Sequence, residues 1–499
     1  MKWHSGARAE QSEESMALFT VEELREVISV KVLAGDPSPS NKRRIRHIST
    51  DSRSIRRGDL FVALKGEKFD GHEFVPAVLA KGAAGAIVHD EYRLPQGKST
   101  GLKSTGRTEP FLFGVRDTLF AYQQLATHHR SRFEIPVVAV TGSNGKTTTK
   151  EMVASVLAQR WRTLKTEGNF NNRIGVPYTL FRLTARHQAA VIEMGVDQQG
   201  QTTRLCEIVR PTIGIITNIG PDHLEFFGSM EGSAQAKAEL LDLLPADGTA
   251  ILNADDPYFG YLAARAQCRV VSFGLSEMAD VRATQVTSDP RRGTGFRLLL
   301  PGKSRHTPVT IKVHGAHNVT NALAAAAVGF ILNLPGATIA QGLARFRPAA
   351  MRSQIVTHHG VQIINDCYNA NPASMKAALK LLAQWSPARE RVAVLGDMLE
   401  LGRETQQMHR EVGQFLALLN LSRLIVCGTL GHEIAEGARR AGMPESSIVE
   451  MPGAAAAADF LRSMVRQGDV VLVKASRGMK MEQIVQVLTG MRAVTKQAS

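Results

Sequence analysis

The segment with the clearest chemical content is glycine-rich and ends in a lysine and three threonines, Thr141–Thr149. Such loops bind phosphate because glycines let backbone N–H groups approach the oxygens, while the lysine meets the β/γ charge and a hydroxyl holds Mg²⁺. The segment lies between an apolar stretch and an expected helix, which disfavours the alternative of a Gly-Asn turn followed by chance by Lys-Thr. It is a variant of the standard pattern, because Val140 stands where glycine is usual. The residues assigned to phosphate binding are Gly142, Gly145, Lys146 and Thr147.

Three further residues carry groups that can act beside a nucleotide. Glu193 follows the apolar stretch Ala189–Ile192, and His223 follows the stretch Ile213–Thr217. Ligands of open α/β sheets bind at the carboxyl ends of strands, so a carboxylate and an imidazole there can hold Mg²⁺. Histidine is an unusual Mg²⁺ ligand, so a structural role stays open for His223. Lys237 falls within an expected helix, where a solvated lysine is the ordinary alternative.

The composition limits the classes of protein to which the chain can belong. Its 499 residues, 43% hydrophobic and 21% charged, predict about three folded domains and exclude disordered, collagen-like and coiled-coil proteins. The net charge of +14 is spread evenly along the chain, which argues against nucleic acid and suits a polyanionic small substrate. Four widely spaced cysteines indicate neither a zinc site nor a disulfide framework, so a reducing cytoplasm is expected. The longest apolar run, Leu323–Leu332, is too short to span a bilayer, so no membrane insertion is expected.

The N-terminal part of the chain predicts a short extension followed by a first domain. Residues 1–15 are polar and are expected to be disordered, and the first domain is expected to span residues 16–134. Thr20 is expected to cap its first helix. Residues 95–108, rich in Gly, Ser, Thr and Lys, are expected to be a surface insertion. The other elements expected in this domain are strands over 59–64 and 85–89 and a helix over 74–80.

Strands alternate with helices through the rest of the chain, which is typical of parallel sheets covered by helices. The central domain is expected to span residues 135–346 and the C-terminal domain residues 347–499. The central domain is predicted to contain a helix over 146–161 and strands over 137–140, 189–192, 213–217 and 250–252. The C-terminal domain is predicted to contain a doubly wound sheet, with strands over 361–364, 392–395, 424–426, 448–451 and 470–473 and helices over 374–385, 405–419, 433–441 and 454–465.

Several short motifs resemble those of the Mur ligase superfamily of ATP-dependent amide-forming ligases. They are TGSNGKTTTK from Thr141, EMG from Glu193, NIGPDHLE from Asn218, AQAKAE from Ala234 and GAHNVTNALAA from Gly315. The resemblance covers the chain from about Met16 to its C-terminus. It implies an α/β protein of three domains: a small N-terminal α/β domain that binds UDP, a central P-loop ATPase domain with a parallel sheet, and a C-terminal Rossmann-like, doubly wound domain.

Four longer segments resemble those of the family members that add a dipeptide: 166–177, 366–375, 395–402 and 473–477. For such a member, the resemblance implies that ATP phosphorylates the terminal carboxylate of a UDP-N-acetylmuramoyl-tripeptide. The amine of D-alanyl-D-alanine then attacks the acyl phosphate and releases phosphate. This reaction belongs to cytoplasmic peptidoglycan precursor synthesis. The expected partners of the protein are these two small molecules, with no nucleic acid, and a monomer is expected.

The resemblance also implies roles around the nucleotide. The ATP-binding residues would be Gly142, Ser143, Asn144, Gly145, Lys146, Thr147, Thr148, Asn321, Arg352 and Asp366. Thr147 and Glu193 would bind one Mg²⁺. His223 would bind a second Mg²⁺ with the help of Lys237, which would be carbamoylated and so carry a carboxylate. The catalytic residues would be Lys146, Glu193, His223 and Lys237.

The remaining implied roles concern the two substrates. Ser52 and Lys68 would bind the UDP-linked substrate, with ordinary surface-turn residues as the alternative. Asn369, Asn371 and Arg477 would lie near the incoming dipeptide.

Other activities stay open as alternatives. Ligases of the same family that add a single amino acid share most of the motifs, and folylpolyglutamate synthase has a similar phosphate loop. A nucleotide-binding regulator without catalysis would be expected to lack one of the four catalytic residues, all of which are present. A nucleic-acid-binding ATPase is disfavoured by the even spread of charge. The identity of the third residue of the tripeptide is also open.

Overall fold

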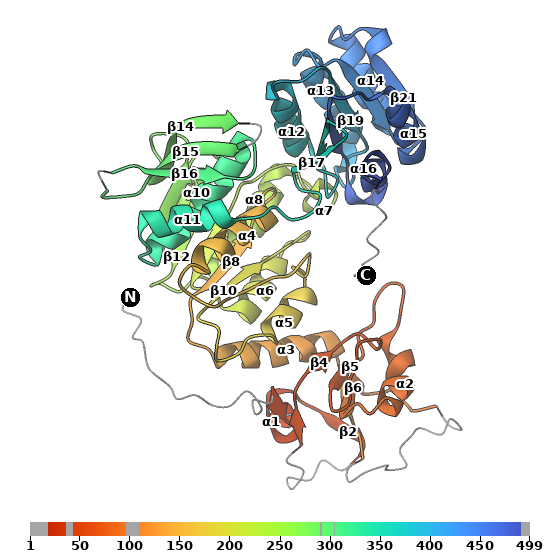
Figure 1. The fold of residues 1–499 in the computed structure, drawn as a ribbon. Coiled ribbons are helices and arrows are strands. Elements are labelled where there is room, and N and C mark those ends of the chain that lie inside the picture. The colour runs from red at the N-terminus through yellow and green to blue at the C-terminus, as the bar shows by residue number, and fades with distance from the viewer. Residues whose placement is uncertain (1–17, 36–42, 96–108, 290–291, 304, 491–499) are drawn as a thin grey trace. The chain divides into compact units, whose positions relative to one another are not determined.

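The computed structural model describes residues 18–35, 43–95, 109–289, 292–303 and 305–490 (Figure 1). The chain divides into two compact units, Met1–Glu134 with Arg173–Ala185, and Ile135–Asn172 with Arg186–Ser499. The predicted extension over residues 1–15 and all but the first residue of the predicted insertion over 95–108 lie outside the described residues.

The first unit contains a five-stranded sheet in the order β2-β7-β6-β5-β4. Its strands are β2 (Lys31–Ala34), β4 (Ile48–Ser49), β5 (Leu60–Val62), β6 (Gly85–His89) and β7 (Phe111–Val115), of which only β2 pairs antiparallel. The helices are α1 (Val21–Val27), α2 (Val75–Ala80), α3 (Thr118–Ser131) and α5 (Gly175–Leu180), and β1 (Phe19–Thr20) pairs with β3 (Arg44–Ile45). Both predicted strands and the predicted helix of this domain are confirmed.

The predicted cap of the first helix is also confirmed. The Oγ1 atom of Thr20 accepts a hydrogen bond from the backbone N–H of Glu23, and the Glu23 carboxylate accepts one from the N–H of Thr20. This reciprocal capping box satisfies two N–H groups that would otherwise lack partners at the helix start.

The first sheet of the second unit has nine strands in the order β16-β15-β14-β13-β12-β11-β8-β10-β9. They are β8 (Val137–Thr141), β9 (Thr163–Lys165), β10 (Ala189–Glu193), β11 (Ile213–Ile216), β12 (Thr249–Asn253), β13 (Arg269–Gly274), β14 (Val281–Asp289), β15 (Gly293–Leu299) and β16 (Thr307–Ile311). All four predicted strands are present, and pairing is parallel from β9 to β14. The antiparallel strands β15 and β16 extend the sheet beyond its predicted parallel part.

Helices cover both faces of this sheet. The helices α4 (Lys146–Leu157), α10 (Ala316–Ile331) and α11 (Gly336–Arg345) share one apolar core with the sheet. The helix α8 (Met230–Asp242) covers the other face, where Leu240 packs over Gly214 of β11. The helix predicted over 146–161 ends four residues early, because the N–H groups of Arg160 and Trp161 turn back onto the carbonyl of Leu157 and lead the chain into β9.

The second sheet of this unit has six strands in the order β17-β18-β22-β19-β20-β21. The five predicted strands are confirmed as β18 (Val361–Asn365), β19 (Arg391–Leu395), β20 (Arg423–Cys427), β21 (Ile448–Met451) and β22 (Val470–Lys474). The four predicted helices are confirmed as α12 (Pro372–Gln384), α13 (Thr405–Ala417), α14 (Gly431–Arg440) and α15 (Ala454–Met464). The antiparallel edge strand β17 (Gln354–His358) and the helix α16 (Glu482–Thr489) were not predicted.

Candidate active site

The phosphate loop joins β8 to α4 and requires glycine at two positions. Gly142 has a φ of 133° and Gly145 a φ of 80°, values that favour glycine. A Cβ atom on Gly142 would lie 2.1 Å from Oγ1 of Thr217, and one on Gly145 would lie 2.4 Å from Oδ1 of Asn321. Asn321 of α10 therefore packs directly against the loop. The N-terminus of α4 begins at the next residue, which is a favourable position for an anion.

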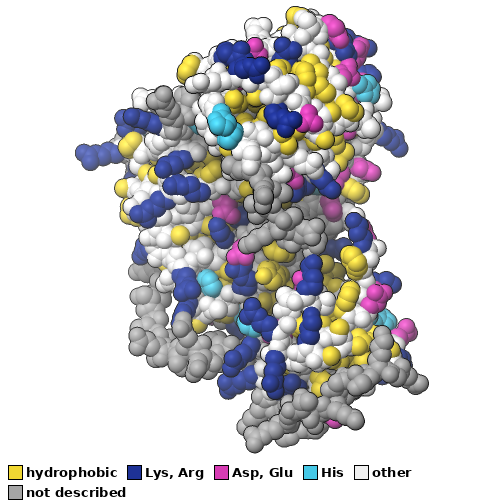
Figure 2. Space-filling model, turned by 45° about the vertical axis from the view of Figure 1, so that its right-hand side comes forward, with side chains coloured by type: hydrophobic (Ala, Val, Ile, Leu, Met, Phe, Trp, Pro, Cys, Tyr) yellow, Lys and Arg dark blue, Asp and Glu magenta, His cyan; other side chains and the backbone are white. Residues whose placement is uncertain are grey.

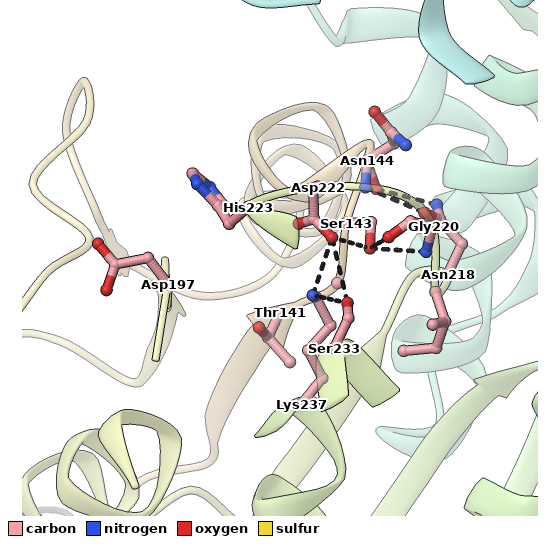
Figure 3. Close-up of polar contacts among 12 residues, drawn as sticks. Thr141, Ser143, Asn144, Asp197, Asn218, Gly220, Asp222, His223, Ser233 and Lys237 are labelled. Atoms are coloured by element: carbon pink, nitrogen blue, oxygen red, sulfur yellow. Dashed lines mark hydrogen bonds and ion pairs between the residues drawn. The ribbon is translucent and has the colours of Figure 1, made fainter. Parts of the chain in front are cut away.

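The loop that follows β11 holds the phosphate loop from the side. The Ser143 hydroxyl donates to Oδ1 of Asp222 at 2.5 Å and accepts from the N–H of Gly220 at 2.8 Å. The N–H of Asn144 donates to Oδ1 of Asn218 at 3.0 Å. Figure 3 shows these contacts meeting at Ser143 and Asn144. Hydrogen bonds between two adjacent loops thus fix the shape of the phosphate loop.

Lys146, the first residue of α4, places a cation over this loop. Its Nζ donates to the carbonyl oxygens of Gly142 at 2.5 Å and of Ser143 at 3.1 Å. Both acceptors are neutral, so the ammonium keeps its full charge for an anion. A lysine held in this way provides the positive charge that a transferring phosphoryl group requires.

Glu193 at the end of β10 lies beside Thr147. Its Oε1 accepts hydrogen bonds from Oγ1 of Thr147 at 3.0 Å and from Nδ2 of Asn171 at 2.9 Å. Its Oε2 is buried and has no hydrogen-bond partner. Mg²⁺ prefers oxygen ligands and keeps several waters, so a carboxylate with one oxygen free of hydrogen bonds, beside a threonine hydroxyl, fits such an ion. Among the described residues, no three His, Cys, Asp or Glu side chains form a metal-binding group by themselves.

Lys237 is a buried lysine paired with a buried carboxylate. Its side chain is 1% exposed, and its Nζ lies 3.0 Å from Oδ1 of Asp222 and 2.6 Å from Oγ of Ser233. Burial lowers the pKa of Lys237 to about 8, against the opposing effect of Asp222. Burial raises the pKa of Asp222, but the charges of Lys237 and Lys146 outweigh it and bring that pKa below its ordinary value. The solvated alternative for Lys237 is therefore wrong.

His223 has left-handed backbone geometry and points away from Lys237 (Figure 3). Its Nδ1 lies 2.7 Å from Oε2 of Glu400, a residue of the loop between β19 and α13. The structure therefore brings His223 to the second sheet of the unit, while Asp222, its neighbour in sequence, contacts Lys237.

A cavity of about 550 Å³ brings most of the predicted site residues together. One wall contains the predicted residues Ser143, Asn144, Gly145, Lys146, Thr147, Thr148, Glu193, His223 and Asn321, and the other contains Arg352, Asp366, Asn369 and Asn371. Gly142, Lys237 and Arg477 are not among the residues that line it.

The second wall is built around one ion pair. Lys474, at the end of β22, donates to Oδ2 of Asp366 at 2.5 Å and to the carbonyl of Asn369 at 2.9 Å. Burial raises the pKa of Asp366, but Lys474 and the hydrogen bonds to the carboxylate lower it by more. The guanidinium of Arg352 lies 3.9 Å from the ring centroid of Tyr368. The Arg352 guanidinium and the Tyr368 ring thus line the wall of the cavity opposite the phosphate loop.

Asn371 connects the two walls. Its Oδ1 accepts from the N–H of Ser374 and caps α12, while its Nδ2 donates to Oδ1 of Asn144 at 2.8 Å. One side chain therefore ties the start of a helix on the second sheet to the phosphate loop.

Three predicted site residues lie elsewhere. Arg477 is exposed and pairs with Glu482 at 2.8 Å. In the first unit, the carbonyl oxygen of Ser52 accepts a hydrogen bond from Lys81 at 2.9 Å, and Lys68 is exposed in the loop after β5.

Sequence reasoning missed residues that stood inside the motifs it used. Asp222 precedes His223, Asn171 belongs to the segment 166–177, and Lys474 belongs to the segment 473–477. A buried charge needs a partner of opposite sign, so Lys237 and Asp366, if buried, each require an oppositely charged side chain nearby. Their partners lie 15 and 108 residues away in sequence, and the motifs alone do not indicate this pairing.

No helix in the described part of the chain is both long enough and apolar enough to cross a membrane.

Three family models match the chain. They describe the Mur ligase middle domain over residues 140–329, the Mur ligase, glutamate ligase domain over residues 351–477, and the Mur ligase family, catalytic domain over residues 44–108. The phosphate loop, Glu193, His223, Lys237 and Asn321 all fall within the first match, and the second wall of the cavity falls mostly within the second.

Named relatives are similar along nearly their whole length. The UDP-N-acetylmuramoyl-tripeptide–D-alanyl-D-alanine ligase of Bacillus subtilis is 36% identical over 455 residues, which cover 90% of this chain and 95% of that protein. A crystal structure of MurF from Acinetobacter baumannii matches with a TM-score of 0.83 and 33% identity, covering 95% of this chain and 99% of that one. The MurF ligase of Thermotoga maritima in complex with ADP matches with a TM-score of 0.77 and 27% identity, covering 89% and 97%. Because the models, the relatives and the geometry of the site agree, the chain belongs to the Mur ligase family.

Proposed function

We propose that the protein is an ATP-dependent ligase that joins D-alanyl-D-alanine to a UDP-N-acetylmuramoyl-tripeptide through an amide bond. The observation that carries this proposal is the single cavity that holds the phosphate loop and Glu193 on one wall and Asp366, Asn369 and Asn371 on the other. The names of the Bacillus subtilis relative and of the other similar proteins support the choice of substrates.

The first chemical step brings two anions together, the carboxylate of the tripeptide and the γ-phosphate of ATP. A carboxylate oxygen of the tripeptide attacks the γ-phosphorus of ATP, the bond to the β-phosphate oxygen breaks, and ADP leaves. The amine of the dipeptide then attacks the acyl carbon, phosphate leaves, and the nitrogen loses a proton. Lys146 lowers the repulsion between carboxylate and phosphate, because a cation oriented in advance stabilises the charge that develops on transfer.

Mg²⁺ would be held by Thr147 and Glu193, and the absence of a hydrogen bond at Oε2 of Glu193 supports this role. A bound Mg²⁺ neutralises phosphate charge and polarises the transferred group. A second Mg²⁺ would use His223 and Lys237, the latter as a carbamate formed from the amine and CO₂. In this structure the two side chains lie apart, His223 beside Glu400 and Lys237 beside Asp222. The lowered pKa of Lys237, about 8, supports this modification because CO₂ reacts with the neutral amine.

We further propose three functional domains: residues 16–134 for the uridine nucleotide with Ser52 and Lys68, residues 135–346 for ATP, and residues 347–499 for the dipeptide with Asn369, Asn371 and Arg477. A monomer is proposed, as the family resemblance implies. The four free cysteines, three of them buried, support a cytoplasmic location. Figure 2 shows Lys and Arg scattered among apolar and acidic side chains on the visible face, which supports small-molecule substrates over nucleic acid.

The test is a phosphate-release assay that crosses acceptors with amine donors. UDP-N-acetylmuramoyl-tripeptide or -dipeptide is combined with D-alanyl-D-alanine or single amino acids, and folate is combined with glutamate. Phosphate release is expected only when the tripeptide and D-alanyl-D-alanine are present together. Release with the UDP-linked dipeptide and one amino acid would assign a different ligase of this family, and release with folate and glutamate would assign a folylpolyglutamate synthase.

A further inference from the structure

Lys150 of α4 is a fully buried lysine one helical turn beyond Lys146. Its side chain has 0% exposure, and its Nζ donates to the carbonyl of Thr166 at 2.8 Å. Two carboxylates lie beside it: Oε1 of Glu151 at 3.0 Å and Oε2 of Glu193 at 3.6 Å. Burying an ammonium ion is costly unless its charge and donors are satisfied. Here the two carboxylates balance its charge, and the Thr166 carbonyl and Glu151 accept its hydrogen bonds.

The two carboxylate neighbours do not depend on Lys150 equally. Glu151 has a second cation, since its Oε2 pairs with Nζ of Lys165, which is 42% exposed. Burial raises the pKa of Glu151, but Lys150 and Lys165 together lower it by more. For Glu193, by contrast, Lys150 is the cation at ion-pair distance within the described part of the chain.

The two oxygens of Glu193 are held in different ways. Oε1 accepts hydrogen bonds from Thr147 and Asn171, whereas Oε2 faces Lys150 at 3.6 Å without a hydrogen bond. Attraction without a hydrogen bond fixes the direction of the carboxylate but leaves the lone pairs of Oε2 free. A carboxylate that must bind a cation benefits from this arrangement, because partners of metal ligands orient them.

Lys150 also acts on Glu193 through Thr166. The Thr166 carbonyl accepts from Lys150, and the Thr166 hydroxyl accepts from the backbone N–H of Glu193 at 3.0 Å. Five residues later, Asn171 donates to the Glu193 carboxylate. The ammonium thus fixes the start of the segment whose end orients the same carboxylate.

We propose that Lys150 is a positioning residue of the ligase reaction: a fixed buried cation that holds the Glu193 carboxylate in the orientation in which it binds the metal with Thr147. Lys150 touches neither nucleotide nor substrate in this role. The proposal rests on the metal-binding role of Glu193 in the proposed function, and the experiment separates the two.

The experiment measures binding rather than turnover. The affinity of the full-length protein for Mn²⁺ in the presence of ADP is measured by electron paramagnetic resonance, with Mn²⁺ in place of Mg²⁺. The variants are K150M, K150Q, K150R, E193Q and the control K165M, and the melting temperature of each is recorded. K150Q keeps a donor for Thr166 without the charge, and K165M removes the exposed partner of Glu151 only.

K150M and K150Q are expected to bind Mn²⁺ roughly 10- to 100-fold more weakly, the usual effect of removing the partner of a metal ligand. K150R, which keeps the charge, is expected to retain most of the affinity, and K165M is expected to match the parent. If K150M fails to fold, the comparison of K150Q with K150R decides.

Parent-like Mn²⁺ affinity in K150Q together with weakened binding in E193Q would overturn the proposal, even if the melting temperature fell, because Lys150 would then be only structural. An equal loss in K150R and K150Q would overturn it too, since charge would not be the cause. Parent-like affinity in E193Q would instead remove the metal site from the proposed function.

Discussion

At the scale of single residues, the described part of the second unit contains three buried lysines, each beside a carboxylate. Lys150 lies beside Glu193, Lys237 beside Asp222, and Lys474 beside Asp366. Removing one partner of a buried pair leaves an uncompensated charge, which costs far more than the net stabilisation that the pair provides. Substituting one residue of such a pair is therefore expected to have a measurable effect, and the effect differs from pair to pair.

The variant K237A tests the proposed carbamate. Its phosphate release is expected to fall on the order of 10²-fold or more, the usual loss when an oriented charge at a phosphoryl-transfer site is removed. Formate or acetate is expected to restore part of the rate, because a small carboxylate in the vacated space can replace the carbamate that the proposal assigns to Lys237. K146A is the control: it should lose activity without rescue, since its missing group is a cation. Full activity of K237A without added acid would end the idea.

The variant D366N tests the ion pair on the second wall. Leaving Lys474 buried without its carboxylate should lower the free energy of unfolding by about 3 to 5 kcal/mol at pH 7. The folded-state pKa of Asp366 lies below the unfolded value of 3.8, so the pair stabilises the protein above pH 3.8 and loses this effect as the pH falls through the folded pKa. The difference in unfolding free energy between the parent and D366N should therefore stay nearly constant from pH 7 to about pH 5 and shrink only as the pH falls through 3.8 toward the folded pKa of Asp366. A difference that shrinks between pH 7 and pH 5 would contradict the assignment.

At the scale of elements, the sequence predicted the parts with a regular pattern. The five strands and four helices predicted around the second sheet are all present. Short buried apolar runs separated by amphipathic segments are compatible with few other secondary structures. The antiparallel strands β14, β15 and β16 were missed because polar residues, glycine or proline interrupt the apolar residues in each of them. The edge strand β17 has no fully buried residue, so its sequence lacks the apolar run that marked the others.

The start of α12 allows a test of how one helix is tied to the phosphate loop. In N371S, serine can still cap the helix but cannot reach Asn144, so the free energy of unfolding should fall by no more than the contribution of that one hydrogen bond. The KM for ATP should rise roughly fivefold, as expected for the loss of one hydrogen bond of about 1 kcal/mol. The variant N371A loses both functions and should also lose about 1 kcal/mol of stability. A parent-like KM in N371S would show that the bond to Asn144 has no role in nucleotide binding.

At the scale of the whole molecule, the two sheets of the second unit present the same kind of edge to the cavity. The carboxyl ends of β8, β10 and β11 carry the phosphate loop, Glu193 and the loop to His223, and those of β18 and β22 carry Asp366 and Lys474. The sequence predicted which strand ends carry chemistry, because ligands bind at this edge of α/β sheets. That both edges meet in one cavity was implied only by the family resemblance, which grouped Arg352 and Asp366 with the phosphate loop. Residue spacing alone does not indicate it, since it depends on packing between distant segments.

The first unit contains the proposed site for the uridine nucleotide, and K68A tests it. Removing this exposed cation should raise the KM for the UDP-linked tripeptide roughly tenfold, the loss expected for one charge-assisted hydrogen bond to phosphate. The KM for ATP should not change. K31A, at the opposite edge of the same sheet in β2, is the matched control and should behave like the parent. An equal effect of both variants would reduce the role of Lys68 to general electrostatics.

The position of β22 has a consequence for how the protein is made. This strand is the last of the second sheet in sequence, yet it pairs with both β18 and β19 in the middle of that sheet. While the chain is being translated, β18 and β19 emerge without their common neighbour, and each presents an unpaired edge that can recruit other chains. Asp366 is synthesised more than a hundred residues before Lys474. Until Lys474 is synthesised, the Asp366 carboxylate lacks its cation. A growing chain therefore cannot complete its second sheet or this wall of the cavity until residue 474 has been made.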